Sequence, residues 1–191
     1  EQQLLVDELT SIAKEQAARI TEKRRKAAKQ VEKEMSERLV PLGIPKVRFE
    51  VNVLPDELSY DGADKVVFLF SANSSSPMRP VEQVASGGEI ARVMLSLKAM
   101  IGNAVELPTI IFDEIDTGVS GRVAEQMAQI MKEMGSNDRQ VISITHLPQI
   151  AALGTTHYKV AKEETATGTA SRMTMLDDEA RVRKIAQMLS D

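Results

Sequence analysis

The sequence predicts a protein of the α/β class with one long helix at its start. From residue 86 to residue 153, helical apolar spacing alternates with short apolar runs that are typical of buried strands. Such alternation is typical of a mostly parallel sheet flanked by helices. Residues 1–40 contain neither glycine nor proline and are rich in Glu, Lys, Arg, Gln and Ala, which is the composition of a long helix.

The predicted long helix has a thin apolar stripe beside a basic run at 23–29. The stripe comprises Leu5, Leu9, Ile12, Gln16, Ile20, Ala27, Val31, Met35 and Leu39. A helix with so narrow a stripe cannot be buried in one small domain, so we expect residues 1–40 to be the end of a coiled-coil helix that packs on a partner helix. The alternative is an ordinary amphipathic helix docked on its own domain.

The segment from 41 to 80 predicts two strands after the helix. Pro41 and Pro45 stop the helix, and residues 47–53 then alternate between apolar and polar side chains, which is the pattern of a half-buried strand. Turns at 55–56 and 61–62 lead to a second strand at 66–70. The polar stretch 71–80 is a loop by composition.

The remaining chain predicts the α/β part. We expect helices at 88–102 and 121–134, strands at 109–112 and 140–145, a short helix after Pro148, and a hairpin formed by 157–163 and 171–176. Asp177 is positioned to cap a last helix. The predicted domains are therefore the helix 1–40 and an α/β lobe 41–191.

Composition limits the classes of protein that the chain can belong to. A length of 191 residues with 42% hydrophobic content allows a packed core, and with 3% aromatics that core is built from aliphatic side chains and ten methionines. The absence of cysteine excludes disulfides and suits a cytoplasmic protein. No apolar run approaches the roughly 18 to 20 residues of a membrane span. A net charge of −4 gives no global attraction to nucleic acid.

Two adjacent carboxylates follow the apolar strand at 109–112. Ligands bind at the carboxyl ends of strands in open α/β sheets, so Asp113 and Glu114 are expected at such an edge. There Asp113 can hold Mg²⁺, directly or through water, and Glu114 can polarise a water that attacks a γ-phosphate. An apolar strand that ends in Asp-Glu is also common without any such role.

A Ser-Gly-Gly-Glu stretch precedes the helix at 88–102. Ser86, Gly87, Gly88 and Glu89 would place a hydroxyl and two unshielded backbone amides at a helix N-terminus, which suits an anion. A capping box accounts for Ser86 and Glu89 without any ligand, but it does not require the two glycines.

His146 directly follows the second apolar strand of the α/β part. We expect its imidazole at the same sheet edge as Asp113, where it can hydrogen-bond a γ-phosphate or the attacking water. An isolated strand-end histidine is more often structural, so the prediction depends on the order of the whole set. His157, inside a later strand, is expected to be structural.

This order of motifs resembles the ATP-binding-cassette (ABC) ATPases. Residues 86–89 are similar to their signature motif, 110–114 to Walker B, 116–118 to the D-loop, and His146 to the H-loop. A long helix directly before a signature-bearing lobe resembles the SMC-type branch, and the wording of 84–92, 112–121 and 145–152 resembles a bacterial DNA-repair member of it. The resemblance implies the C-terminal lobe of an ABC/SMC-type P-loop ATPase head.

The resemblance also implies a mechanism that needs a second lobe. No G-x-x-x-x-G-K-[ST] sequence occurs in the chain, so the Walker A lobe would come from elsewhere in the same protein, and this part alone is expected to be inactive. Glu114 and His146 would be catalytic, Asp113 would hold Mg²⁺, and residues 86–89 would close over ATP bound by a second head of a homodimer. Asp116 would lie at that dimer interface.

The implied function is an ATPase that couples nucleotide binding and hydrolysis to head dimerisation and to the holding of DNA in double-strand break repair and recombination. The expected location is the bacterial cytoplasm, at the nucleoid, with no membrane partner. Two alternatives stay open. One is a non-hydrolysing coiled-coil scaffold that contacts DNA through the basic run 23–29, and the other is a different SMC-like or RecF-like ATPase.

Overall fold

The structure is a computed structural model that describes residues 2–84, 87–102, 107–135, 139–165 and 168–190. The chain divides into two compact units, Glu1–Ser96 and Leu97–Asp191, and each is described by itself. The boundary falls inside helix α2 (Gly87–Gly102). The predicted division at residue 40 stays a prediction. Among the described helices, none combines the length and the apolar character that crossing a bilayer requires.

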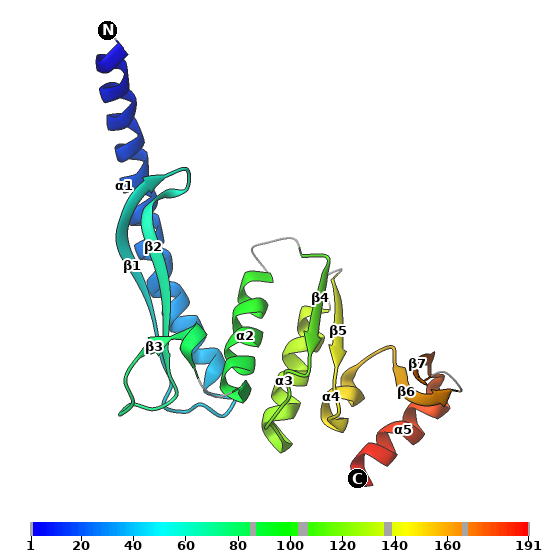
Figure 1. Cartoon of the computed structure of the whole chain (residues 1–191). Coiled ribbons are helices and arrows are strands. Elements are labelled where there is room, and N and C mark those ends of the chain that lie inside the picture. Colours follow the sequence, from blue (N-terminus) through cyan, green and yellow to red (C-terminus); the bar gives the residue numbers. More distant parts are fainter. Residues whose placement is uncertain (1, 85–86, 103–106, 136–138, 166–167, 191) are drawn as a thin grey trace. The chain divides into compact units, whose positions relative to one another are not determined.

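The first unit begins with the long helix α1 (Gln2–Leu39), as predicted (Figure 1). The helix ends just before Pro41, where Gly43 adopts a φ of +82° and the Ile44 amide donates to the Leu39 carbonyl at 3.2 Å. Only a residue such as glycine adopts this left-handed conformation without strain. The turn buries Leu39, Leu42 and Ile44.

Strands β1 (Arg48–Ser59) and β2 (Gly62–Ser71) form an antiparallel hairpin that lies along α1, and the short strand β3 (Arg79–Pro80) adds to β2. A 3₁₀ turn, η1 (Val81–Gln83), follows β3. Both strands of the hairpin are longer than predicted. The expected turn at 55–56 is wrong, because Pro55 pairs with Asp64 and the chain bends only by an irregularity between Pro55 and Ser59. A proline is tolerated there because β1 is an edge strand. The predicted turn at 61–62 is confirmed.

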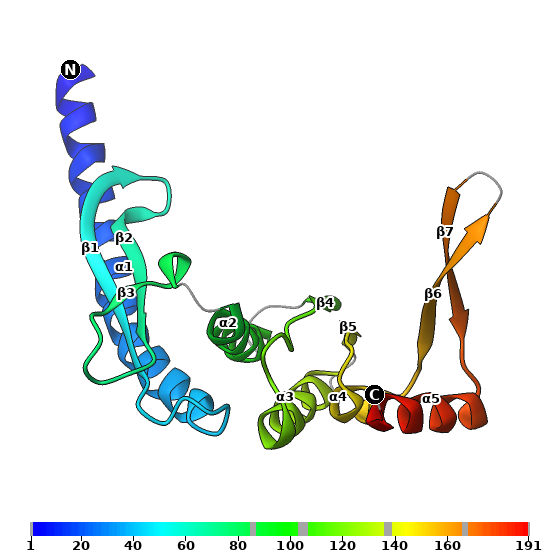
Figure 2. The same ribbon diagram turned by 60° about the horizontal axis from the view of Figure 1, so that its bottom comes forward.

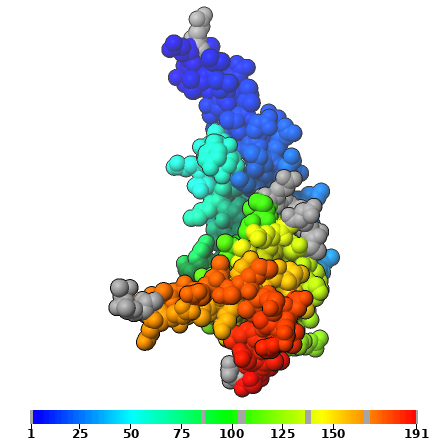
Figure 3. Space-filling model, turned by 90° about the vertical axis from the view of Figure 1, so that its right-hand side faces the viewer, coloured from blue at the N-terminus to red at the C-terminus, as the bar shows by residue number. Residues whose placement is uncertain are grey.

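The C-terminal half of α1 packs on this hairpin. Ala17, Ala28, Met35 and Leu39 are its buried residues. The apolar side chains nearer the start of α1 are exposed, and Figure 3 shows that part of the helix (dark blue) extending beyond the hairpin (cyan). These exposed side chains are Leu4, Leu5, Val6, Leu9 and Ile12. The docked-helix alternative therefore describes the second half of the stripe, and a partner helix for the first half stays a prediction.

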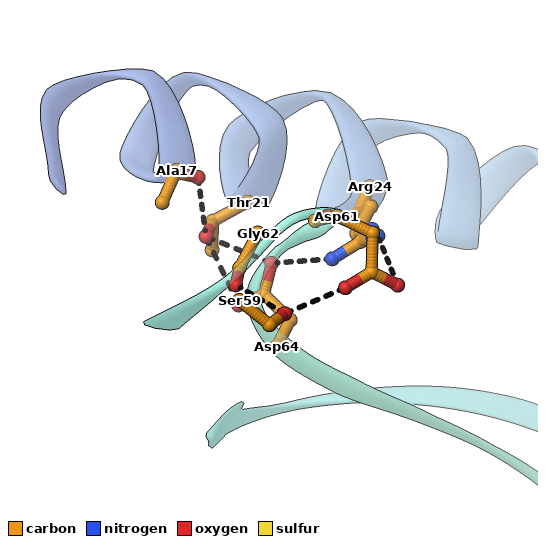
Figure 4. A network of polar contacts seen from close by, with 7 residues as sticks. All are labelled: Ala17, Thr21, Arg24, Ser59, Asp61, Gly62 and Asp64. Carbon is orange, nitrogen blue, oxygen red and sulfur yellow. Dashed lines mark hydrogen bonds and ion pairs between the residues drawn. The ribbon is translucent and has the colours of Figure 1, made fainter. Parts of the chain in front are cut away.

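A buried carboxylate connects α1 to the hairpin (Figure 4). The side chain of Asp64 is 4% exposed, and its two oxygens lie 2.9 and 2.8 Å from the Thr21 hydroxyl. Arg24 Nη1 lies 3.3 Å from Asp64 Oδ2, while Arg24 Nη2 donates to the Asp61 carbonyl at 2.8 Å. A buried charge is tolerated only when it is paired and hydrogen-bonded, so this part of the basic run has a structural role.

Glu32 makes a second polar connection between α1 and β1. Its Oε1 accepts a hydrogen bond from the Val51 amide at 3.0 Å, and its Oε2 lies 2.8 Å from Lys29 Nζ. Burial acts to raise the pKa of Glu32, but the hydrogen bonds from Lys29 and Val51 outweigh it and hold the pKa below its usual value. The contact therefore stabilises the fold above the ordinary glutamate pKa, and this contribution is lost as pH falls through the lowered pKa.

Replacing Arg24 with methionine is expected to lower the free energy of unfolding by about 1–3 kcal/mol, because Asp64 stays buried with one partner fewer. The effect stays below that of a fully buried pair because the Arg24 side chain is 27% exposed. Urea unfolding followed by circular dichroism measures it. Arg25→Met is the matched control on an exposed position of the same helix, with an expected change within about 0.5 kcal/mol. Equal losses in both variants would contradict the structural role of Arg24.

The second unit contains the parallel pair β4 (Thr109–Asp113) and β5 (Gln140–Ile144), joined through helix α3 (Gly121–Met134). Within the part of the chain that the structure describes, it is the one parallel pair. In β4, Ile110 and Phe112 are buried while Ile111 is 59% exposed. The buried face of α3 comprises Ala124, Met127, Ala128, Met131 and Met134. As expected, methionine and small aliphatic side chains build this core.

The rest of the second unit follows the predicted order (Figure 2). Helix α4 (Pro148–Leu153) leads to the antiparallel hairpin of β6 (Tyr158–Thr165) and β7 (Gly168–Met175), and then to α5 (Asp178–Ser190). The predicted cap of α5 is confirmed, because Asp177 Oδ1 accepts a hydrogen bond from the Ala180 amide at 2.8 Å.

Candidate active site

The two predicted carboxylates lie at the carboxyl end of β4. Asp113 is the last residue of the strand, is paired in register with Ile144 of β5, and is exposed. Glu114 follows it, also exposed, and its amide donates to the Ile144 carbonyl at 3.1 Å. The strand pair therefore presents both carboxylates to solvent from one sheet edge.

The backbone of Glu114 is in the left-handed region, with a φ of +46°, and no other described non-glycine residue has a positive φ. This conformation costs of order 1–3 kcal/mol for a residue with a side chain and is concentrated at functional sites. The Thr117 hydroxyl supports the turn by donating to the Glu114 carbonyl at 3.0 Å. A glycine would adopt this turn without strain, so a side chain at this position has a reason other than stability.

Asp116 lies in the same loop, and the structure brings it to the end of β5. Its side chain is 1% exposed. The Thr145 hydroxyl donates to Asp116 Oδ2, and His146 Nδ1 lies 3.7 Å from Asp116 Oδ1. The His146 side chain is 68% exposed. The loop after β4 and the end of β5 are thus joined by one buried carboxylate beside an accessible imidazole.

Sequence reasoning missed the part played by Thr145. Besides its bond to Asp116, the Thr145 hydroxyl accepts a hydrogen bond from the Leu147 amide at 3.0 Å, which shapes the chain around His146. The signal was a hydroxyl residue directly before a strand-end histidine, but such a residue also occurs at ordinary strand ends. His157, expected to be structural, approaches the Ala151 carbonyl through Nε2 at 2.6 Å.

The Ser-Gly-Gly-Glu stretch belongs to the first unit. Ser86 and its predicted capping role lie outside the described residues. Helix α2 begins at Gly87, one residue earlier than predicted, and Gly87 is exposed while Gly88 and Glu89 are half-buried. A methyl group on Gly87 would meet no atom within 4 Å, so packing does not explain this glycine.

The carboxyl end of β4 can hold a metal ion only together with a ligand. The described residues contain no group of three or more His, Cys, Asp or Glu side chains that could hold a metal on their own. Mg²⁺ is usually bound through one or two carboxylates together with waters and substrate phosphates, and the exposed pair Asp113 and Glu114 fits this requirement.

Comparison with known proteins gives sequence relatives of one kind. No protein-family model matches the chain. The chain is 37% identical over 207 residues to the DNA repair protein RecN of Bacillus subtilis, which covers 98% of the chain and 36% of that protein. It is 35% identical over 175 residues to RecN of Vibrio cholerae, covering 91% and 31%. The chain thus spans about a third of the length of the curated relatives that it matches.

Solved structures agree on the fold. The chain superposes on an SMC head domain with an extended coiled coil from Pyrococcus furiosus, bound there to the C-terminal domain of ScpA, with a TM-score of 0.64 and 20% identity over 99% of this chain and 44% of that one. A structure from a study of ATP-driven dimerisation of SMC ATPases gives a TM-score of 0.57 and 20% identity, over 90% of this chain and 98% of that chain. The fold is therefore that of an ABC/SMC-type head lobe with a long N-terminal helix, as predicted. Taken with the sequence relatives, it shows that this chain belongs to the RecN family of SMC-like proteins.

Proposed function

We propose that this chain is the C-terminal part of an SMC-like ATPase that acts in DNA double-strand break repair and recombination. The observation that carries the proposal is the arrangement at the ends of β4 and β5, where two exposed carboxylates, Asp113 and Glu114, share a sheet edge with an accessible imidazole, His146. The names of the relatives, DNA repair proteins, supply the biological setting.

In this proposal each residue of the edge has a separate task. Asp113 holds Mg²⁺ beside the phosphates of ATP, and the metal supplies neutralisation of the charge that develops during phosphoryl transfer. Glu114 accepts a hydrogen bond from the attacking water and orients it. His146 contributes a second hydrogen bond at the same place. The exposure of all three side chains is consistent with a site completed by another surface.

The proposed ATPase is incomplete without two partners. A Walker A lobe of the same protein would cradle the phosphates, and this chain alone would be inactive. Ser86, Gly87, Gly88 and Glu89 would close over ATP bound by a second head of a homodimer, with the open space around Gly87 allowing a close approach. The loop that contains Asp116 would lie at the head interface. Hydrolysis would separate the heads and change how DNA is held, in the bacterial cytoplasm at the nucleoid.

The alternative is a non-hydrolysing scaffold that contacts DNA through the basic run at 23–29. The structure weakens this reading, because Arg24 pairs with Asp64 and Lys29 pairs with Glu32 of the same chain. The exposed charges left in the run are Lys23, Arg25 and Lys26. A strained backbone at Glu114 also has no purpose in a scaffold. A different SMC-like or RecF-like ATPase is disfavoured by relatives that are named RecN.

Calorimetric titration with ATP and Mg²⁺ tests the proposal, first on this chain and then on its mixture with a separately made Walker A lobe of the same protein. We expect binding and turnover in the mixture and neither in the chain alone. Tight binding by the chain alone, or binding without turnover in the mixture, would contradict the split-site ATPase and favour the scaffold.

A further inference from the structure

A buried carboxylate oxygen in the second unit has no hydrogen-bond partner. Asp116 Oδ2 accepts the Thr145 hydroxyl, but Asp116 Oδ1 is buried and no donor lies within hydrogen-bonding distance of it. An unpaired buried oxygen of a charged group is costly, and native proteins pair such groups almost without exception. The polar group placed to pair with it is His146 Nδ1 at 3.7 Å, which is longer than a hydrogen bond.

The loop holds Asp116 in place and leaves His146 free to approach. The Asp116 carbonyl accepts the Val119 amide at 3.1 Å, and Gly118 turns the chain with a φ of +71°. Thr145 is fixed in turn by the Leu147 amide at 3.0 Å. The exposed imidazole of His146 therefore needs only a small rotation to bring Nδ1 within reach of Oδ1. Polar contacts of this kind are often long in a protein without its substrate and shorten when the site closes.

We propose that Asp116 is a positioning residue for His146, holding a proton on Nδ1 so that Nε2 is the ring atom presented to the reacting groups. This inference rests on the proposed ATPase function for its purpose, but not for its geometry. The two nitrogens of a neutral imidazole have opposite roles, and a carboxylate beside one of them determines which is the donor. With Nδ1 as the donor to Asp116, the neutral ring accepts a hydrogen bond through Nε2, which suits the attacking water better than a phosphate oxygen.

The second histidine of the chain provides an internal reference. His157 approaches the Ala151 carbonyl through Nε2 at 2.6 Å, and because a carbonyl oxygen only accepts, this ring must carry its proton on Nε2. The chain contains two histidines, so both rings are resolved in one spectrum. The inference therefore predicts opposite tautomers for the two: the proton on Nδ1 in His146 and on Nε2 in His157.

The test is a ¹⁵N-edited NMR measurement of the imidazole rings in this chain, without nucleotide, at about pH 8.5, above the ordinary histidine pKa. His146→Gln assigns the signals. We expect the Nδ1–H tautomer to dominate in His146 and the Nε2–H tautomer in His157. A free neutral imidazole favours Nε2–H, so an Nε2–H majority at His146 in the unmodified chain would overturn the inference without any variant.

Variants then separate Asp116 from its neighbours. Asp116→Asn removes the charge and is expected to return His146 to mainly Nε2–H while His157 is unchanged. Asp113→Asn, the same substitution on a carboxylate that makes no described contact with His146, should leave both tautomers as they were. Thr145→Val should weaken the Nδ1–H preference and Thr145→Ser should restore it. A tautomer at His146 that is the same in Asp116→Asn as in the unmodified chain contradicts the inference.

Turnover in the complemented ATPase gives a second readout. Asp116→Asn is expected to lower kcat by about 10- to 100-fold with little change in the KM for ATP, as observed when carboxylates that orient a histidine are replaced. A rise in KM at constant kcat would instead indicate a role in binding and would overturn the positioning role. The NMR result does not depend on turnover, so failure of the ATPase proposal is distinguishable from failure of this inference.

Discussion

Replacing Glu114 with glutamine is expected to lower ATP turnover by about 10²- to 10⁴-fold in the complemented protein. The amide keeps the size of the side chain but cannot accept a proton from the attacking water. Glu114 is exposed, so neither the fold nor nucleotide binding should change. Steady-state hydrolysis and calorimetric ATP binding, measured on the same preparations, separate the chemical step from binding.

The matched control is Glu125→Gln, which makes the same substitution at an exposed position of α3. Its turnover should equal that of the unmodified protein. A second variant, Glu114→Gly, relieves the backbone strain at φ +46° and should leave the fold at least as stable while turnover is lost. Normal turnover in Glu114→Gln would remove Glu114 from the chemistry and with it the proposed mechanism.

Replacing Phe112 with alanine is expected to lower the free energy of unfolding by about 3–5 kcal/mol, because Phe112 is 2% exposed and its removal leaves a cavity beside the sheet. This loss is a large fraction of the stability of an ordinary domain. Because Phe112 directly precedes Asp113, we also expect the candidate site to lose its order in this variant. Urea unfolding followed by circular dichroism gives the change in free energy.

Ile111→Ala is the control for Phe112→Ala. The two residues are neighbours on β4 and face opposite sides, and Ile111 is 59% exposed. Its truncation should cost less than about 1 kcal/mol, since little surface is withdrawn from water there. If both variants lost similar stability, the two faces of β4 would not differ as the structure describes.

Local rules made most of the elements predictable. The absence of glycine and proline through residue 40 predicted α1, and the aspartate before the last apolar face predicted the cap that Asp177 makes with the Ala180 amide. Alternating apolar spacing predicted β4, α3 and β5 to within a residue or two. These features depend on contacts between residues close in the sequence, which a sequence pattern records directly.

Contacts between distant segments were not predictable in the same way. The turn expected at Pro55 does not form, because β1 continues along β2 and its partner Asp64 is held by Thr21 of α1, 43 residues earlier in the chain. The basic run at 23–29 suggested a solvated or DNA-binding face, yet Arg24 pairs with a buried carboxylate. Neither the pairing nor the burial leaves a signal in the spacing of residues.

The candidate site divides along the same line. The amino-acid order alone specifies that Asp113, Glu114 and His146 follow two apolar strands, and parallel pairing then brings those strand ends to one edge. Packing in three dimensions selects the rest: the left-handed backbone of Glu114, the burial of Asp116, and the approach of its carboxylate to His146. Strand and helix formation is governed by neighbours along the chain, whereas a buried charge must find its partner in space, wherever in the sequence that partner lies.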